Sequence, residues 1–141
     1  MYRILLAIDS NEQRAKQAAE AVVDIPRDPE DVDVLILNVF EDFEYRDDSV
    51  IKSEDMFEGS EPPESVSIAT EILKEAEITI STRREHGDPT EQIVSVAEEI
   101  DADMIALSGR KRSPTGKVLF GSVTQSVLLA ANRPVHIVIG N

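Results

Sequence analysis

The sequence predicts an α/β fold in which five parallel strands form a doubly wound sheet with helices on both faces. Five short apolar runs alternate with segments whose apolar residues recur at helical spacing. Some of these runs are apolar without interruption, as in strands that are buried on both faces of a parallel sheet. With 141 residues and no cysteine, we expect one domain, residues 1–141, without disulfides or thiolate metal sites.

The first strand and the first helix occupy the start of the chain. Residues 2–9 are an apolar run that ends in Asp9, so this carboxylate is expected at the carboxyl edge of the sheet. Ser10 or Asn11 can cap the following helix, residues 12–23, whose apolar face consists of alanine and valine. Two prolines soon after this segment end the helix.

The middle of the chain combines two strands with a long connection. Residues 32–40 form a largely apolar run, typical of a strand buried on both faces. Residues 41–64 are acidic, contain glycine and prolines, and show no clear period, which indicates a long connection suited to a lid or an interaction surface. Apolar residues recur at helical spacing from Pro63 or Glu64 to Ala76, and residues 78–84 alternate like an edge strand.

The last elements follow a turn in which Asp88 is placed to cap a helix and Pro89 to be its first residue. Ser122 is placed to cap a later helix in the same way. In a doubly wound sheet, ligands bind at the carboxyl ends of the strands, where the winding direction reverses. The remaining elements are expected at residues 104–108 (strand), 122–131 (helix) and 135–139 (strand).

Charge is distributed unevenly along the chain. Residues 104–141 contain five basic residues and no acid, a net charge of +5, whereas residues 1–103 contain nine bases and 28 acids, a net charge of −19; the sum is −14. This acidic total argues against general nucleic-acid binding, which needs a basic surface. Four of the basic residues lie in Ser108–Thr124, where glycines and hydroxyls accompany them, a composition that indicates a phosphate-binding loop.

Composition also predicts where in the cell the protein acts and at what salt concentration. The N-terminal apolar run is too short for a signal peptide or a membrane span, so we expect a cytoplasmic protein without a membrane or nucleic-acid partner. The abundant acids, together with more arginine than lysine, resemble halophilic proteins. An ordinary acidic cytosolic protein is the alternative.

The chain contains the motifs ILLAIDS (4–10), LNV (37–39), HGDP (86–89), DADMIALSG (101–109) and GSVTQSVLLAANRPVHIV (121–138). Taken together, these motifs resemble those of the universal stress protein family, and the resemblance extends over nearly the whole chain. The resemblance implies the family's fold, an adenine nucleotide alpha hydrolase-like sheet of five parallel strands in the order 3-2-1-4-5. It also implies a homodimer through the last strand, Val135–Ile139, because family members often pair in this way.

A subset of the family binds ATP, and resemblance to that subset implies a ligand for this chain. The ligand would be ATP or another adenine nucleotide, with or without bound magnesium. It would act as a regulatory ligand in stress response. Ile8 and Asp9 would contact adenine and ribose, and Val39 would line the base pocket. The phosphates would be bound by Gly109, Lys111, Arg112, Gly121, Ser122, Val123 and Thr124.

The glycine pattern of this subset is matched incompletely. Gly109 and the pair Gly121–Ser122 match its ends, but Lys111 or Arg112 replaces its second glycine, depending on the direction of counting. An interaction protein of the same fold, whose basic loop contacts a protein partner or an inorganic anion, is therefore the alternative. A hydrolase or phosphotransferase is a third class, but the sequence shows no nucleophile with a base and an orienting group, so at most slow ATP hydrolysis is expected.

Overall fold

The structure, a computed structural model, describes residues 1–40, 43–44, 50–51, 63–110 and 121–140. Strands and helices alternate along the chain, as the sequence predicts. In order they are β1 (Tyr2–Ile8), α1 (Glu12–Val23), the 3-10 helix η1 (Pro29–Asp31), β2 (Val32–Phe40), β3 (Phe43–Glu44), β4 (Val50–Ile51), α3 (Glu64–Glu75), β5 (Thr79–His86), α4 (Pro89–Glu99), β6 (Met104–Arg110), α5 (Ser122–Ala130) and β7 (Val135–Gly140).

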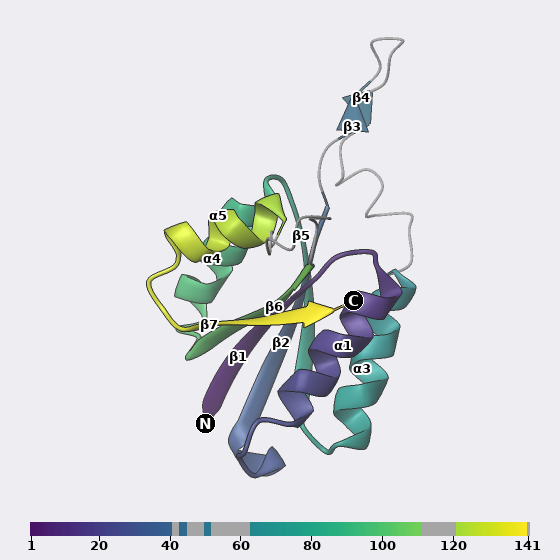
Figure 1. The fold of residues 1–141 in the computed structure, drawn as a ribbon, viewed down its shortest axis with the longest axis vertical. Helices are drawn as coiled ribbons and strands as arrows, with labels where there is room; N and C mark the ends of the chain where they lie inside the picture. The colour runs from purple at the N-terminus through teal and green to yellow at the C-terminus, as the bar shows by residue number, and fades with distance from the viewer. Residues whose placement is uncertain (41–42, 45–49, 52–62, 111–120, 141) are drawn as a thin grey trace, which may run out of the picture.

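Five parallel strands form the main sheet in the order β5-β2-β1-β6-β7, which confirms the predicted order 3-2-1-4-5. Helices α1 and α3 cover one face, and α4 and α5 cover the other (Figure 1). The winding direction reverses at the central strand β1. A short antiparallel pair, β3 with β4, lies in the predicted connection, residues 41–64. Most of that connection, the predicted lid or interaction surface, lies outside the described residues.

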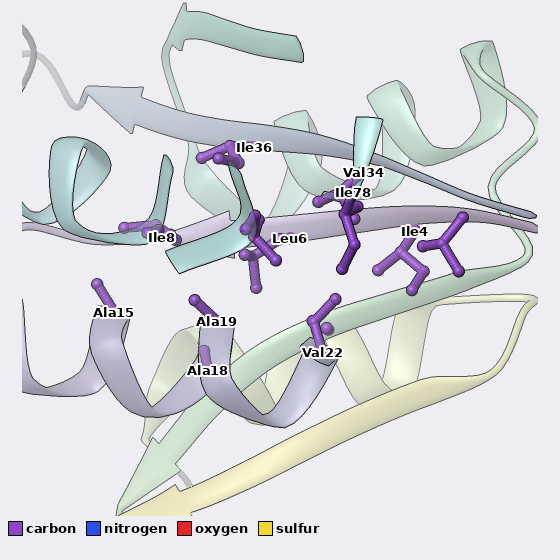
Figure 2. Close-up of a cluster of buried hydrophobic side chains, with 14 of the residues drawn as sticks. Ile4, Leu6, Ile8, Ala15, Ala18, Ala19, Val22, Val34, Ile36 and Ile78 are labelled. Atoms are coloured by element: carbon purple, nitrogen blue, oxygen red, sulfur yellow. The ribbon is translucent and has the colours of Figure 1, made fainter. Parts of the chain in front are cut away.

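The face under α1 and α3 is closely packed. Three alanines of α1, Ala15, Ala18 and Ala19, are at most 2% exposed and point toward the sheet (Figure 2). Their small side chains let the helix approach Leu6 and Ile36 of the sheet, which are both at most 1% exposed. Burying a side chain of that size contributes about 1.5–3 kcal/mol, so this layer is a large part of the stability.

The face under α4 and α5 has a separate core. Leu5 and Ile105 from the sheet are fully buried against Val96 of α4 and Val127 of α5. The core reaches the carboxyl edge of the sheet through Leu107. This second core borders the region in which the ligand site is expected.

Strands β5, β6 and β7 each end later than the sequence predicts, because strand pairing extends them. Strand β6 was expected to end at residue 108, but Gly109 and Arg110 pair with Ile139 and Gly140 of β7. Strand β5 continues to His86 because it remains paired with β2 as far as Phe40. Both ladders depend on neighbours that are distant in the sequence.

Helix caps follow the local chemistry at two of the three predicted positions. Asn11 caps α1 by accepting a hydrogen bond from the Arg14 amide at 2.8 Å, and Asp88 caps α4. The prediction that Ser122 caps the last helix is wrong. Ser122 is the first residue of α5, and Gly121 occupies the cap position with a positive φ of 88°.

Candidate functional site

The site lies where the ladder between β1 and β6 ends. On its β2 side, β1 is paired from Tyr2 through Ile8. On its β6 side, pairing extends only from Ile4 to Leu6. The interrupted ladder leaves a crevice at the carboxyl edge of the sheet, at the point where the winding direction reverses. Such switch points are the usual ligand sites of doubly wound sheets.

A cavity of about 290 Å³ occupies this crevice. Its size lies near the lower end of the range for small-molecule sites, about 300–1,000 Å³. The wall is mostly apolar, with a few polar groups. The lining residues come from β1, the turn after it, β2, α4, β6 and α5, and they are Ala7, Ile8, Asp9, Leu37, Val39, Pro89, Ile93, Leu107, Ser108, Val123 and Thr124.

Asp9 supplies the carboxylate of this wall. Its Oδ1 accepts a hydrogen bond from the Asn11 amide at 2.9 Å, and its Oδ2 accepts two from Arg14, one from Nη2 at 2.8 Å and one from Nε at 3.3 Å. The side chain is nevertheless 55% exposed. Each carboxylate oxygen has two lone pairs, so these three bonds leave acceptor capacity on Oδ1 for a hydroxyl of a ligand.

The first turn of α5 supplies backbone amides. Gly121, in the cap position, has φ 88° and ψ 156°, a region that is essentially restricted to glycine. Among the described residues, no side chain caps this helix, whereas Asn11 and Asp88 cap α1 and α4. Uncapped amides at the positive end of the helix dipole attract anions. Thr124 anchors the turn by donating a hydrogen bond to the Ser108 carbonyl at 2.9 Å.

A second cavity, of about 320 Å³, lies between β2, β5 and the end of α4. It contains two guanidinium groups, but both are already paired. Nε of Arg3 lies 3.6 Å from Oδ2 of Asp33, and Arg83 forms ion pairs with Glu85 and Glu99. Although this cavity is slightly larger, its chemistry is that of a saturated ion-pair network, so we assign the site to the first cavity.

Within the described ranges, no group of three His, Cys, Asp or Glu side chains is arranged to hold a metal ion. None of the helices in the described part of the chain is both long and apolar enough to cross a membrane.

A model of the universal stress protein family matches residues 1–138. The chain belongs to the universal stress protein family. A universal stress protein of Mycolicibacterium smegmatis is 34% identical over 64 residues, which are 45% of this chain and 49% of that protein. The matched region therefore spans about half of that relative's length.

Solved structures of universal stress proteins share the whole fold. One from Archaeoglobus fulgidus has a TM-score of 0.74 and 29% identity, with 98% of both chains covered. Another from the same organism, in complex with dAMP, has a TM-score of 0.69 and 24% identity, again with 98% of both chains covered. Because the identity to the second structure is only 24%, the similarity to it shows the shared fold alone.

The structure brings only some of the predicted ligand residues to the cavity. Those in its wall are Ile8, Asp9, Val39, Val123 and Thr124. Gly121 and the exposed Ser122 begin the helix that carries the last two. Gly109 is buried within β6, and in the described part of the chain its neighbour Ser108 forms the wall instead. Lys111 and Arg112 lie outside the described residues.

Sequence reasoning missed the apolar half of the wall. Leu37, Ile93 and Leu107 are indistinguishable in the sequence from ordinary core residues. One signal could have found them, since Leu37 and Leu107 lie near the carboxyl ends of strands and Ile93 lies near the start of a helix. In parallel sheets these positions meet at one edge.

Proposed function

We propose that the chain binds an adenine nucleotide in the crevice between β1 and β6, as a regulatory ligand in stress response. One observation carries the proposal: a single cavity joins an acceptor carboxylate, an apolar wall and the uncapped first turn of a helix. A nucleotide needs all three, because its ribose offers hydroxyl donors, its base offers an apolar face, and its phosphates are anions. The dAMP complex of a related universal stress protein supports an adenine nucleotide as the ligand.

In this proposal each part of the wall has its own role. Asp9 accepts hydrogen bonds from the ribose, while Ile8 and Val39 contact the sugar and the base. The phosphates lie at the start of α5, against the residues Gly121, Ser122, Val123 and Thr124. Three further positions complete the proposed phosphate site: Gly109 gives the backbone room, and Lys111 and Arg112 add positive charge.

The test is to identify and measure the ligand. Purified protein is denatured, released nucleotides are identified by mass spectrometry, and AMP and ATP are titrated calorimetrically with and without magnesium. We expect binding that is lost in Asp9→Ala and retained in Asp24→Ala, which removes an exposed carboxylate at the other end of α1. If wild-type protein releases no nucleotide and binds none at millimolar concentration, the proposal fails. The alternative, an interaction protein of the same fold that binds no nucleotide, is then favoured.

We also propose a homodimer through β7, at Val135–Ile139. Strand β7 is at the edge of the sheet, and Ile139 is 43% exposed there. An exposed edge can pair with the same strand of a second copy. Light scattering should give a dimer mass for the wild type and a monomer mass for Ile139→Lys. The control is Thr79→Lys on the opposite edge strand, which should remain dimeric; equal masses for all three proteins would refute the interface.

We further propose that the protein is cytoplasmic and adapted to high salt, and the acidic composition supports the adaptation to salt. Salt screens the repulsion among exposed carboxylates, which a net charge of −14 makes strong. We expect the melting temperature to rise steeply between about 0.1 and 2 M KCl, measured by differential scanning fluorimetry. A flat profile would favour an ordinary acidic cytosolic protein.

A further inference from the structure

The chain segment that carries Asp9 lies beyond the reach of the β-ladder. Pairing with β6 ends at Leu6, and pairing with β2 ends at Ile8. Backbone groups that leave a ladder must find other partners if they are buried. The position of Asp9 therefore depends on contacts other than strand pairing.

Two side chains from neighbouring elements bind consecutive carbonyl groups in this segment. Nδ2 of Asn38, on β2, donates a hydrogen bond to the carbonyl oxygen of Ile8 at 3.0 Å. Oγ of Ser65, on α3, donates one to the carbonyl oxygen of Asp9 at 2.7 Å. Asn38 is 4% exposed and Ser65 is fully buried, so water cannot readily replace either donor.

Both donors occupy places that would ordinarily favour apolar side chains. Ser65 precedes the buried Val66 at the start of α3, and Asn38 lies between Leu37 and Val39 in a buried strand. Oδ1 of Asn38 is buried without a hydrogen-bond partner among the described residues. Polar groups in such places are unfavourable unless a specific bond compensates for them, and here that bond is to the end of β1.

We propose that Ser65 and Asn38 are positioning residues of the ligand site, which hold the backbone of Ile8 and Asp9 so that the carboxylate of Asp9 stays in the cavity wall. Neither residue lines the cavity, so both act through the backbone. Ser65 is the second residue of α3, and a shift of the first turn of α3 therefore moves Asp9. This inference rests on the proposed function only where nucleotide affinity is the readout.

The first experiment uses no nucleotide. Ser65→Ala is compared with Ser67→Ala, which makes the same change at an exposed position of the same helix. Amide hydrogen exchange is measured at Asn11, whose amide binds the Asp9 carboxylate, relative to Leu5 in the centre of the sheet. We expect exchange at Asn11 to accelerate relative to Leu5 in Ser65→Ala alone. The same ratio in both variants would overturn the proposal.

The second experiment measures AMP affinity by calorimetry, at a temperature where circular dichroism finds each variant folded. Loss of one buried hydrogen bond should weaken AMP binding roughly three- to tenfold in Ser65→Ala, with Ser67→Ala unchanged. Wild-type affinity in Ser65→Ala would overturn the positioning role. If wild-type protein binds no nucleotide, the proposed function fails, while the exchange experiment still decides the positioning role.

A second variant is available if Ser65→Ala does not fold. Ser65→Cys nearly preserves the volume and replaces the hydroxyl with a weaker donor. It should accelerate exchange at Asn11 and weaken AMP binding, each to a smaller extent. A cysteine variant that matches wild type in both measurements would count against the proposal.

Discussion

The two sides of β1 differ in how far they are paired, and the difference locates the site. Toward β2 the ladder is continuous from Tyr2 to Ile8, whereas toward β6 it stops at Leu6. The continuous side holds the strand in place, and the interrupted side leaves room for a ligand. Side chains from β2 and α3 then hold the strand end that the interrupted ladder leaves unsupported.

Two valines of β2 compare the closely packed core with the wall of the cavity, because they lie on opposite faces of the same strand. Val34 is fully buried under α1 and α3, whereas Val39 is half-buried in the cavity wall. We expect Val34→Ala to lower the free energy of unfolding by about 2–3 kcal/mol, because it removes two methyl groups and leaves a void. Val39→Ala should lower it by about 1 kcal/mol or less, because that side already faces a cavity.

Urea denaturation measures both free energies, and AMP titration completes the comparison. Val39→Ala should weaken AMP binding, and Val34→Ala should not do so while it remains folded. Equal losses of stability would mean that the cavity wall is packed as closely as the core.

Gly121 tests the helix end of the crevice. An added methyl group at this position would meet no atom within 4 Å, but φ 88° is strained for any other residue. We expect Gly121→Ala to cost about 1–3 kcal/mol of stability and to weaken phosphate-dependent binding. Gly87→Ala, at φ 122° before α4, is the matched control. It should also lose stability, as measured by thermal unfolding, but should leave AMP affinity unchanged. If Gly87→Ala and Gly121→Ala lost AMP affinity equally, the loss in Gly121→Ala would not be evidence that α5 belongs to the site.

The ion pair between β5 and α4 should give the smallest effect. A hydrogen bond from Arg83 lowers the pKa of Glu99 below its ordinary value of 4.5. The folded state therefore holds the Glu99 proton less tightly than the unfolded state does. Its contribution to stability is complete above the ordinary pKa and is lost as pH falls through the lowered value.

We expect the melting temperature of Glu99→Gln to lie slightly below that of the wild type at about pH 7, with the difference vanishing at acid pH. Glu98→Gln, at the neighbouring exposed position, is the control and should differ little at any pH. A difference for Glu99→Gln that does not change with pH would exclude the ion pair as its cause.

Local chemistry was sufficient to predict most of the helices and strands, whereas the order of the strands in the sheet came from the family resemblance. The uninterrupted apolar run of β2 and the Asp88–Pro89 turn before α4 depend on neighbours in the sequence, and the structure has both where they were expected. The extension of β6 to Arg110 depends on pairing with β7, so local patterns could not reveal it.

The candidate site was harder to predict, because its parts meet only in the folded chain. Asp9 and Val39 were found through the family resemblance. The contact between Ser65 and Asp9 joins residues 56 positions apart, and nothing in the local sequence of either residue indicates it. The end of the β1–β6 ladder, which makes the cavity, is likewise a property of the assembled sheet.

Mapping AMP-induced changes in backbone amide chemical shifts tests the central claim most directly, because the second cavity provides an internal control. We expect the largest changes at Asp9, Val39 and Val123, around the crevice between β1 and β6. Ser81 and Ile100, at the second cavity, should remain unchanged. Changes centred on Ser81 and Ile100, or no changes at saturating AMP, would contradict the assignment of the nucleotide site.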